Sequence, residues 1–294
     1  MKSLMSTEKI ERKIDIIDAH VHLFPDKLFR AIWLWFEKHG WKVRYRVDGD
    51  EVVRLLKTLG VSRFVLLNYS HKPGMSASLN AWTHEFVKKH PEAIPFGAIH
   101  PEDENVGGEL DRCFGEYGFK GLKFHTHVTG IRPDDERLFP VYEKLIEHNK
   151  VLMLHSGMGP SLAGYRETTQ EVSGVRFTEK ALRRFPQMKV IVPHLGADEI
   201  DAFFDLLEEY PNLTLDTTMA LSGYFPLKIP WDRMEKWSHR ILYGSDFPNI
   251  PYDLATEINV LRSSGLSRGA QERILGLNAE RLLGISAPNN QPAT

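Results

Sequence analysis

The stretch IDIIDAHVH (14–22) is the first of eight short apolar runs, and the rhythm of these runs decides the fold. The others are VSRFVLLNY (61–69), IPFGAIHP (94–101), GLKFHTHV (121–128), VLMLHSG (151–157), KVIVPHLG (189–196), LTLDTT (213–218) and ILYGSDFP (241–248). Several are almost continuously apolar and β-branched, as strands buried on both faces are. Amphipathic stretches such as DAFFDLLEEY (201–210) separate most of them, and strand alternating with helix predicts a parallel sheet. Eight such units in about 250 residues predict an α/β protein with a closed (β/α)8 TIM barrel, with a doubly wound open sheet as the alternative.

The interval between the first two runs is too long for a simple connection from strand to helix. It holds 38 residues, from Leu23 to Gly60, of which DEVVRLLKTLG (50–60) predicts the first helix of the barrel. The part before it, LFPDKLFRAIWLWFEKHGWKVRYR (23–46), is rich in Trp and Phe. We therefore expect a helical, aromatic insert after strand one (23–49), which forms a lid or pocket wall over the mouth of the barrel. The alternative is that its tryptophans pack on the barrel rim or on a partner subunit.

No low-complexity linker divides the chain, so we expect a single barrel domain over residues 14–285. The last stretch, SAPNNQPAT (286–294), is rich in Pro and Asn and is expected to form a flexible tail.

The charge balance of the chain excludes several classes of partner. Lys and Arg number 37 and Asp and Glu 39, a net charge of −2, which leaves no basic surface for nucleic acid or an anionic membrane. The first residues, MKSLMSTEKIERK (1–13), are charged and lack the apolar region of a signal peptide. The single cysteine, Cys113, excludes an internal disulfide and is expected to be a small buried residue. We expect a cytoplasmic protein with a small-molecule substrate, and a homodimer with the aromatic insert as the candidate interface.

Histidines gather at the C-terminal ends of the predicted strands, where a barrel enzyme keeps its active site. The seven in such positions are His20, His22, His100, His125, His127, His155 and His194. Side chains alternate across a strand, so His20 and His22 share one face. With His155, His194 and Asp246, each after an apolar run, they would place four imidazoles and one carboxylate around a single axis. This set suits Zn, Fe, Mn or Ni better than Mg or Ca, and an open coordination position is typical of a catalytic site.

The same motifs carry a resemblance to a known family. DAHVH (18–22), GFKGLKFH (118–125), LHSG (154–157), PHLG (193–196), YPNLTLDT (210–217), GSDFP (244–248) and NAERLLGI (278–285) resemble the amidohydrolase superfamily. Within it, the chain is similar to the amidohydrolase-related branch of metal-dependent TIM-barrel hydrolases and decarboxylases. The matching residues run from about residue 14 to 285.

The resemblance implies a role for each residue of the histidine cluster. His20, His22, His155 and Asp246 would ligate one divalent ion, with zinc expected and manganese, iron or nickel as alternatives. Asp246 would also contact the metal-bound water and move its proton. His194 would hydrogen-bond that water or a substrate oxygen, so Asp246 and His194 are the expected catalytic residues. Such roles agree with the chemistry, because zinc lowers the pKa of bound water to around 7.

The fourth run leaves two alternatives open. Lys123, His125 and His127 stand at i, i+2 and i+4, so all three can face the same way. Some members of the superfamily carry a carboxylated lysine here that bridges two metals. If Lys123 is such a residue, the site is binuclear, with His194 on the second metal. Otherwise Lys123 lies deeper, paired with a carboxylate such as Asp18. His125 is the expected substrate contact, and Lys123 is a second candidate for substrate binding.

One further basic residue is a candidate for contact with substrate. Arg166 follows the fifth run, on the loop that begins SGMGPSLAG (156–164). It would bind a substrate carboxylate, or it is a solvated arginine.

The sequence favours metal-dependent hydrolysis of a small amide, lactone or ester. The first alternative is non-oxidative decarboxylation of a small unsaturated or aromatic acid at the same site. HTHV (125–128) partly matches the GTHV-like segment of the decarboxylases, whereas Lys123 and His125 depart from it. The second alternative is a barrel that binds metal or ligand without turnover.

Overall fold

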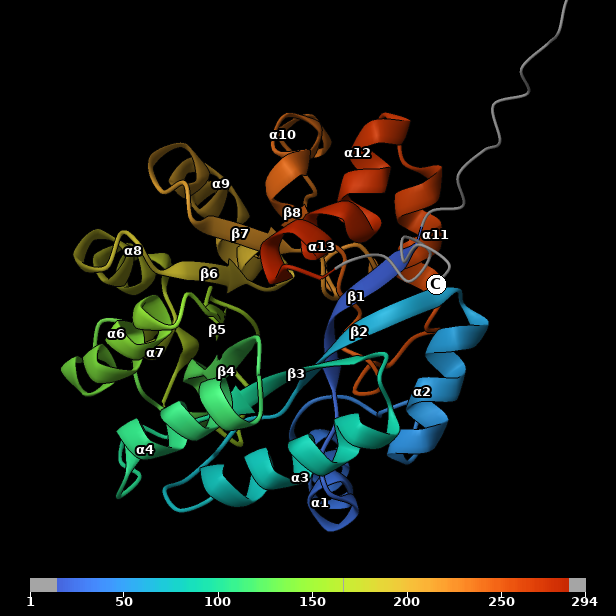
Figure 1. Cartoon of the computed structure of the whole chain (residues 1–294). Helices are drawn as coiled ribbons and strands as arrows, with labels where there is room; N and C mark the ends of the chain where they lie inside the picture. The colour runs from blue at the N-terminus through green and yellow to red at the C-terminus, as the bar shows by residue number, and fades with distance from the viewer. Residues whose placement is uncertain (1–14, 166, 286–294) are drawn as a thin grey trace, which may run out of the picture.

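The computed structural model describes residues 15–165 and 167–285, and within them the eight expected strands form one sheet in chain order (Figure 1). The strands are β1 (Ile16–His22), β2 (Val61–Leu67), β3 (Ala93–Ala98), β4 (Gly121–His125), β5 (Val151–His155), β6 (Lys189–Val192), β7 (Leu213–Asp216) and β8 (Ile241–Leu242). Each pairs with the next in parallel. The predicted parallel order is confirmed.

The barrel closes between the segment after β8 and β1. The backbone N–H of Ala19 donates to the carbonyl of Tyr243 at 2.8 Å, and that of Asp246 donates to the carbonyl of His20 at 2.9 Å. Val21 forms a parallel bridge with Phe247. An open, doubly wound sheet is therefore excluded. The hydrogen bond from Asp246 also holds that residue next to β1, the strand that carries His20.

The helices surround the strands (Figure 1). They are α1 (Asp26–His39), α2 (Gly49–Thr58), α3 (Ser76–Lys89), α4 (Val106–Asp111), α5 (Thr126–Thr129), α6 (Phe139–Glu147), α7 (Thr169–Val172), α8 (Val175–Arg184), α9 (Ile200–Glu209), α10 (Trp231–Lys236), α11 (Thr256–Ser263), α12 (Arg268–Glu272) and α13 (Asn278–Leu283). Short 3-10 segments (Glu136–Leu138, His194–Glu199, Ser238–Arg240) and π turns (Arg112–Glu116, Arg273–Leu277) complete the connections. None of the helices in the described ranges is long and apolar enough to cross a membrane.

Strand alternation sorts side chains between the outer core and the barrel interior. On β4, Leu122 and Phe124 pack in the large core cluster with residues of the surrounding helices. Lys123 and His125 must therefore point to the opposite, inner face. The same alternation on β7 turns Leu215 outward and Asp216 inward. The candidate polar residues thus face the barrel interior, because the apolar residues that alternate with them on the same strands pack against the helices.

A register irregularity adjusts the first strand. The pairing of β1 with β2 shifts between Asp18 and Val21. Ala19 packs in the inner apolar cluster, whereas Val21 packs in the outer one. His20 and His22, which flank Val21, therefore face the barrel interior. Bulges of this kind re-aim side chains next to active sites.

Candidate metal centre at the mouth of the barrel

A cavity of about 270 Å³ opens where the strands end. Its polar residues are His22, His125, His127, His155, His194, Asp198, Asp246 and Asn249, and its aromatic walls include Phe36, Trp41, Tyr69, Tyr165 and Phe225. Among the described residues that line it there is no Lys or Arg. The site is therefore rich in imidazole and carboxylate ligands, with planar apolar walls.

The first group of ligand atoms converges at the closing seam. The Nε2 atoms of His20 and His22 lie 3.4 and 3.1 Å from Oδ1 of Asp246. These separations match the edge of about 3.4 Å of a tetrahedral site with bonds of roughly 2.1 Å. All three side chains are buried, with exposed fractions of 0%, 4% and 7%. The residues present therefore fit one transition-metal ion, as the sequence predicts.

Hydrogen bonds at Nδ1 of His20 and of His22 fix the tautomer of each ring and so the state of its Nε2 atom. His20 Nδ1 lies 2.9 Å from Oδ2 of Asp216, and His22 Nδ1 lies 3.3 Å from the carbonyl of Leu67. A carboxylate and a carbonyl only accept, so both Nδ1 atoms carry the proton and donate it. The Nε2 atoms then carry the lone pairs that a cation would use, and that of His20 also lies 3.1 Å from Nζ of Lys123. This arrangement of ring, acceptor and ligand nitrogen is typical of metal-binding histidines.

His194 lies at the same mouth with its Nε2 unprotonated. Its Nδ1 donates to the carbonyl of Thr218 at 2.8 Å, which leaves Nε2 as an acceptor. Its ring lies 5.9 Å from that of His20, between centroids. His194 and Asp246 both adopt positive φ, 58° and 65°. Non-glycine residues rarely adopt this conformation, and such strain is concentrated at functional sites.

Lys123 lies beneath the first group, fully buried. Its Nζ is 3.1 Å from Nε2 of His20, so the expected salt bridge with Asp18 is not the contact that the structure shows. Asp18 accepts instead from the backbone N–H groups of His20 and Ser245. Burial lowers the pKa of Lys123 to about 8, against the attraction of Asp246 and Asp216. The amine is therefore buried next to a ligand of the first group, and carboxylation of Lys123 stays a prediction.

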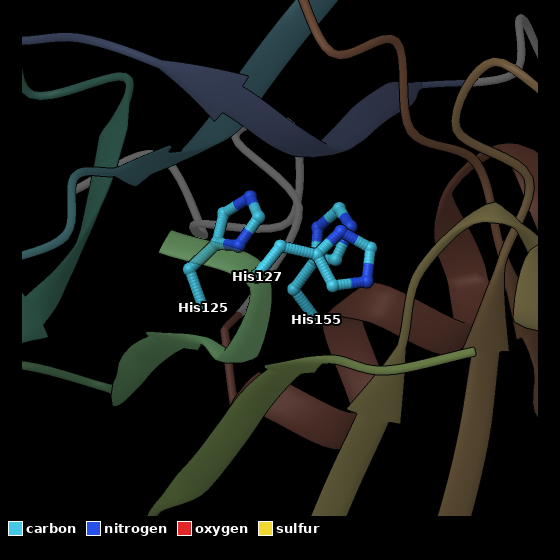
Figure 2. Close-up of side chains that lie close together, drawn as sticks. All are labelled: His125, His127 and His155. Atoms are coloured by element: carbon cyan, nitrogen blue, oxygen red, sulfur yellow. The ribbon is translucent and has the colours of Figure 1, made fainter. Parts of the chain in front are cut away.

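A second group gathers His125, His127 and His155, whose rings turn into one space at the strand ends (Figure 2). His125 and His155 end neighbouring strands in register, and their rings stack with centroids 3.9 Å apart. His155 was expected to complete the first set. That role stays a prediction, and its ring lies 4.8 Å from that of His194.

The chain matches the amidohydrolase family over residues 17–285, nearly its whole length. It belongs to the amidohydrolase family. The sequence resemblance is thereby confirmed, and the matched region includes every residue of both groups.

Solved structures share the fold. An uncharacterized TIM-barrel protein from Bordetella bronchiseptica has a TM-score of 0.72 and 19% identity, covering 92% of this chain and 98% of its own. The 5-carboxyvanillate decarboxylase of Sphingomonas paucimobilis has a TM-score of 0.69 and 16% identity, covering 93% and 100%. A dihydroxybenzoic acid decarboxylase from a Polaromonas species, with bound manganese and 2-nitroresorcinol, has a TM-score of 0.68 and 18% identity, covering 92% and 97%. No match was found among curated proteins. At these identities the likeness establishes the fold.

In this member of the amidohydrolase family the aromatic insert contributes α1 and part of the cavity wall. Phe36 and Trp41 line the cavity, and Nε1 of Trp41 donates to the carbonyl of Asn249 at 2.7 Å. Trp35 packs on Tyr165 with centroids 4.9 Å apart. Trp33 is instead buried against Phe29. Phe36 and Trp41 of the insert thus form part of the cavity wall, and movement of the insert as a lid stays a prediction.

Other expected residues fall outside the site or outside the described ranges. Cys113 is fully buried, as expected, and burial raises the pKa of its thiol. Arg166 and the 286–294 tail lie outside the described residues, so the roles expected of them stay predictions.

Sequence reasoning assigned no role to Asp216 or Tyr69. Asp216 receives three hydrogen bonds and holds His20, and it stands at the end of a predicted strand, which was a usable signal. Tyr69 packs against both His22 and His125, with centroids 5.6 and 4.9 Å away. Its position two residues after β2 is the only hint that the sequence offers.

Proposed function

We propose that this member of the amidohydrolase family decarboxylates a small aromatic carboxylic acid with the help of a divalent metal. The observation that carries the proposal is the pairing of the ligand group His20, His22 and Asp246 with the aromatic walls of one cavity. Planar walls such as Tyr69 and Trp41 suit a flat aromatic ring. Support also comes from the two decarboxylases with the same fold, whose substrates are hydroxylated aromatic acids and one of which holds manganese. Both manganese, one of the expected alternatives, and zinc should therefore be tested as the metal.

His20, His22 and Asp246 would hold the ion. When bound, the ion would act as a Lewis acid on the substrate's oxygen atoms. The imidazoles keep fixed tautomers through Asp216 and the Leu67 carbonyl, so the ligand set needs no rearrangement. The dominant effect on the Asp246 carboxyl is burial, which raises its pKa. The neighbouring His22 and His20 side chains together outweigh burial and hold the pKa below its usual range.

An ionised Asp246 is suited to accept a proton and return it. In the proposed reaction Asp246 takes the proton of a hydroxyl next to the substrate carboxylate and delivers it to the ring carbon that bears that carboxylate. The bond between the ring and the carboxyl carbon then breaks, its electrons restore the aromatic ring, and CO2 leaves. His194 Nε2, an acceptor in this tautomer, would receive a second hydroxyl of the substrate. These roles develop the expectation that Asp246 and His194 are catalytic.

Hydrolysis of an amide, lactone or ester is the second candidate function, and Lys123 is the observation that favours it. Its amine is buried, 3.1 Å from Nε2 of His20, so it lies beside a ligand of the first group. If carboxylated, Lys123 would help to hold two ions, which would supply Lewis-acid activation for hydrolysis at a carbonyl. Mass spectrometry of the intact protein detects such a carboxylate as a labile addition of CO2.

A substrate panel separates these functions. The protein loaded with Mn²⁺ or Zn²⁺ is incubated with dihydroxybenzoic acids and 5-carboxyvanillate, and separately with small lactones, esters and amides. We expect release of CO2 and formation of the corresponding phenol. Ring opening or cleavage without CO2 would replace decarboxylation with hydrolysis. Metal binding with no turnover on either panel would favour the non-catalytic barrel and refute the proposed reaction.

A further inference from the structure

We propose that Glu257 is a positioning residue, which holds the turn from which the Thr218 carbonyl orients His194. Glu257 lies in the first turn of α11, is only 1% exposed and does not line the cavity. It would therefore act on the site through the backbone. The inference rests on the proposed function only for the contact of His194 with substrate, and the positioning itself can be tested without turnover.

A single peptide group lies between His194 and Glu257. The carbonyl of Thr218 accepts from Nδ1 of His194 at 2.8 Å. The N–H of Met219, in the same peptide group, donates to Oε2 of Glu257 at 3.1 Å. The carbonyl and the N–H of a trans peptide point in opposite directions, so this group is held at both ends. Buried hydrogen bonds in such a chain polarise one another, so the carboxyl group strengthens the Thr218 carbonyl as an acceptor for His194.

The turn that contains this peptide group needs support. The N–H of Ala220 closes it and lies 2.9 Å from the carbonyl of Thr217 and 2.7 Å from that of Thr218. The third residue of the turn, Met219, has a φ of 56°. Turns with a positive φ at this position favour glycine or asparagine. A larger side chain is strained there and persists only where the surrounding structure holds it.

Glu257 holds the turn at two points. Oε2 accepts from Met219, as above, and Oε1 accepts from the backbone N–H of Leu221 at 3.0 Å, while the hydroxyl of Tyr252 lies 3.2 Å from Oε2. Burial raises the pKa of this carboxyl group well above its usual range, although these three contacts lower it. A protonated Oε2 can donate to Tyr252 and still accept from Met219, so the contacts with the turn exist in either protonation state.

The same turn forms part of the cavity wall, because Met219 and Ala220 line the cavity. Asp216 accepts from the N–H of Thr218, one peptide group earlier, and so does not replace Glu257. Loss of the carboxyl group should therefore shift the wall and loosen the hydrogen bond of His194 together.

Glu257→Gln tests the positioning. The side chain keeps its size but has one oxygen, so it cannot accept from both Met219 and Leu221 in either orientation. The His194 imidazole is observed by ¹H–¹⁵N NMR of protein labelled at histidine, with and without added ZnCl2, and is assigned with His194→Gln. In Glu257→Gln we expect the Nδ1 proton to move upfield and to exchange with water about tenfold faster, as a weakened hydrogen bond requires.

Two variants serve as controls. Tyr252→Phe removes the third contact of the same carboxyl group and leaves both contacts with the turn. Glu109→Gln makes the same chemical change at another buried carboxylate, 7% exposed, whose partners are side chains away from this turn. The His194 signal should be unchanged in both. If the protein decarboxylates as proposed, Glu257→Gln should also raise KM by about 2- to 10-fold, the worth of one hydrogen bond, with a smaller effect on kcat.

Circular dichroism verifies that each variant is folded, and Glu257→Asp, whose carboxyl group is one methylene further from the turn, replaces Glu257→Gln if the latter does not fold. An unchanged His194 signal in the folded variant would overturn the inference. An equal change in Tyr252→Phe or Glu109→Gln would also overturn it, because the signal would then report a general loosening. A changed signal in Glu257→Gln alone, in a protein that releases no CO2, would support the positioning and refute the proposed reaction.

Discussion

Replacement of Asp216 by Asn should weaken metal binding although Asp216 is not expected to contact the ion. Oδ2 of Asp216 accepts from His20 Nδ1 at 2.9 Å, and its Oδ1 accepts from the backbone N–H groups of Thr218 at 3.0 Å and His194 at 3.3 Å. All three partners are donors, and a carboxylate satisfies them all. An amide has only one oxygen, so it cannot do so in either orientation.

Each orientation of the introduced amide has a definite consequence. If its oxygen stays with the two backbone donors, its NH2 group faces His20 Nδ1. That nitrogen must then become the acceptor, which moves the ring proton to Nε2 and removes the ligand lone pair. If the oxygen instead faces His20, the NH2 group opposes the N–H groups of Thr218 and His194, which are left without an acceptor. The first outcome weakens the metal site and the second destabilises the loops that position it.

The expected loss is about 10- to 100-fold in metal affinity, typical for removal of a hydrogen bond behind a metal ligand. This corresponds to about 1.4 to 2.8 kcal/mol of binding free energy. Competition with a chromogenic chelator measures the dissociation constant. Asp198→Asn, the same chemical change at an exposed carboxylate on the cavity rim, is the control and should bind as the natural protein does. Affinity within about twofold of natural for Asp216→Asn would refute the assigned tautomer of His20.

The remaining predictions concern the first ligand group. His22→Ala removes a ligand of the group His20, His22 and Asp246, so it should abolish turnover and metal binding at this group. The far-ultraviolet circular dichroism spectrum should stay unchanged. Normal metal content with normal turnover would show that His22 is not a ligand. Asp246→Asn should lower kcat by about 10²- to 10⁴-fold, the usual worth of a proton-transfer group, with a smaller loss of metal; a kcat near the natural value would exclude Asp246 from proton transfer. Metal at about 100 times its dissociation constant should raise the free energy of unfolding by about 2.7 kcal/mol, measured by denaturant titration, and a chelator should reverse the gain. An equal gain in His22→Ala would place the bound metal elsewhere.

The barrel was predictable from the sequence because its information is local. Runs such as VLMLHSG (151–157) are apolar over a strand's length and end in a polar residue, and the helices between them are amphipathic. Parallel pairing then follows from the alternation alone. The convergence of His20, His22 and Asp246 also followed, since residues at the same ends of barrel strands must meet.

The partition of the histidines into two groups was not predictable. It depends on a register irregularity in β1 and on the start of α5 directly after His125, which turns His127 back toward His155. If β4 continued through His127, the side chain of His127 would lie on the same face of the strand as Lys123 and His125. The contact between Lys123 and His20 likewise depends on side-chain depth across the barrel, which no sequence spacing encodes.

The most direct test of the central claim is an anomalous diffraction measurement on crystals grown with MnCl2. We expect an anomalous peak within about 2.3 Å of Nε2 of His20, Nε2 of His22 and Oδ1 of Asp246, in the space that these atoms already enclose. The same map should lose this peak in His22→Ala. A map from fully metal-loaded crystals with no peak among these three atoms would contradict the metal centre on which the proposed reaction depends.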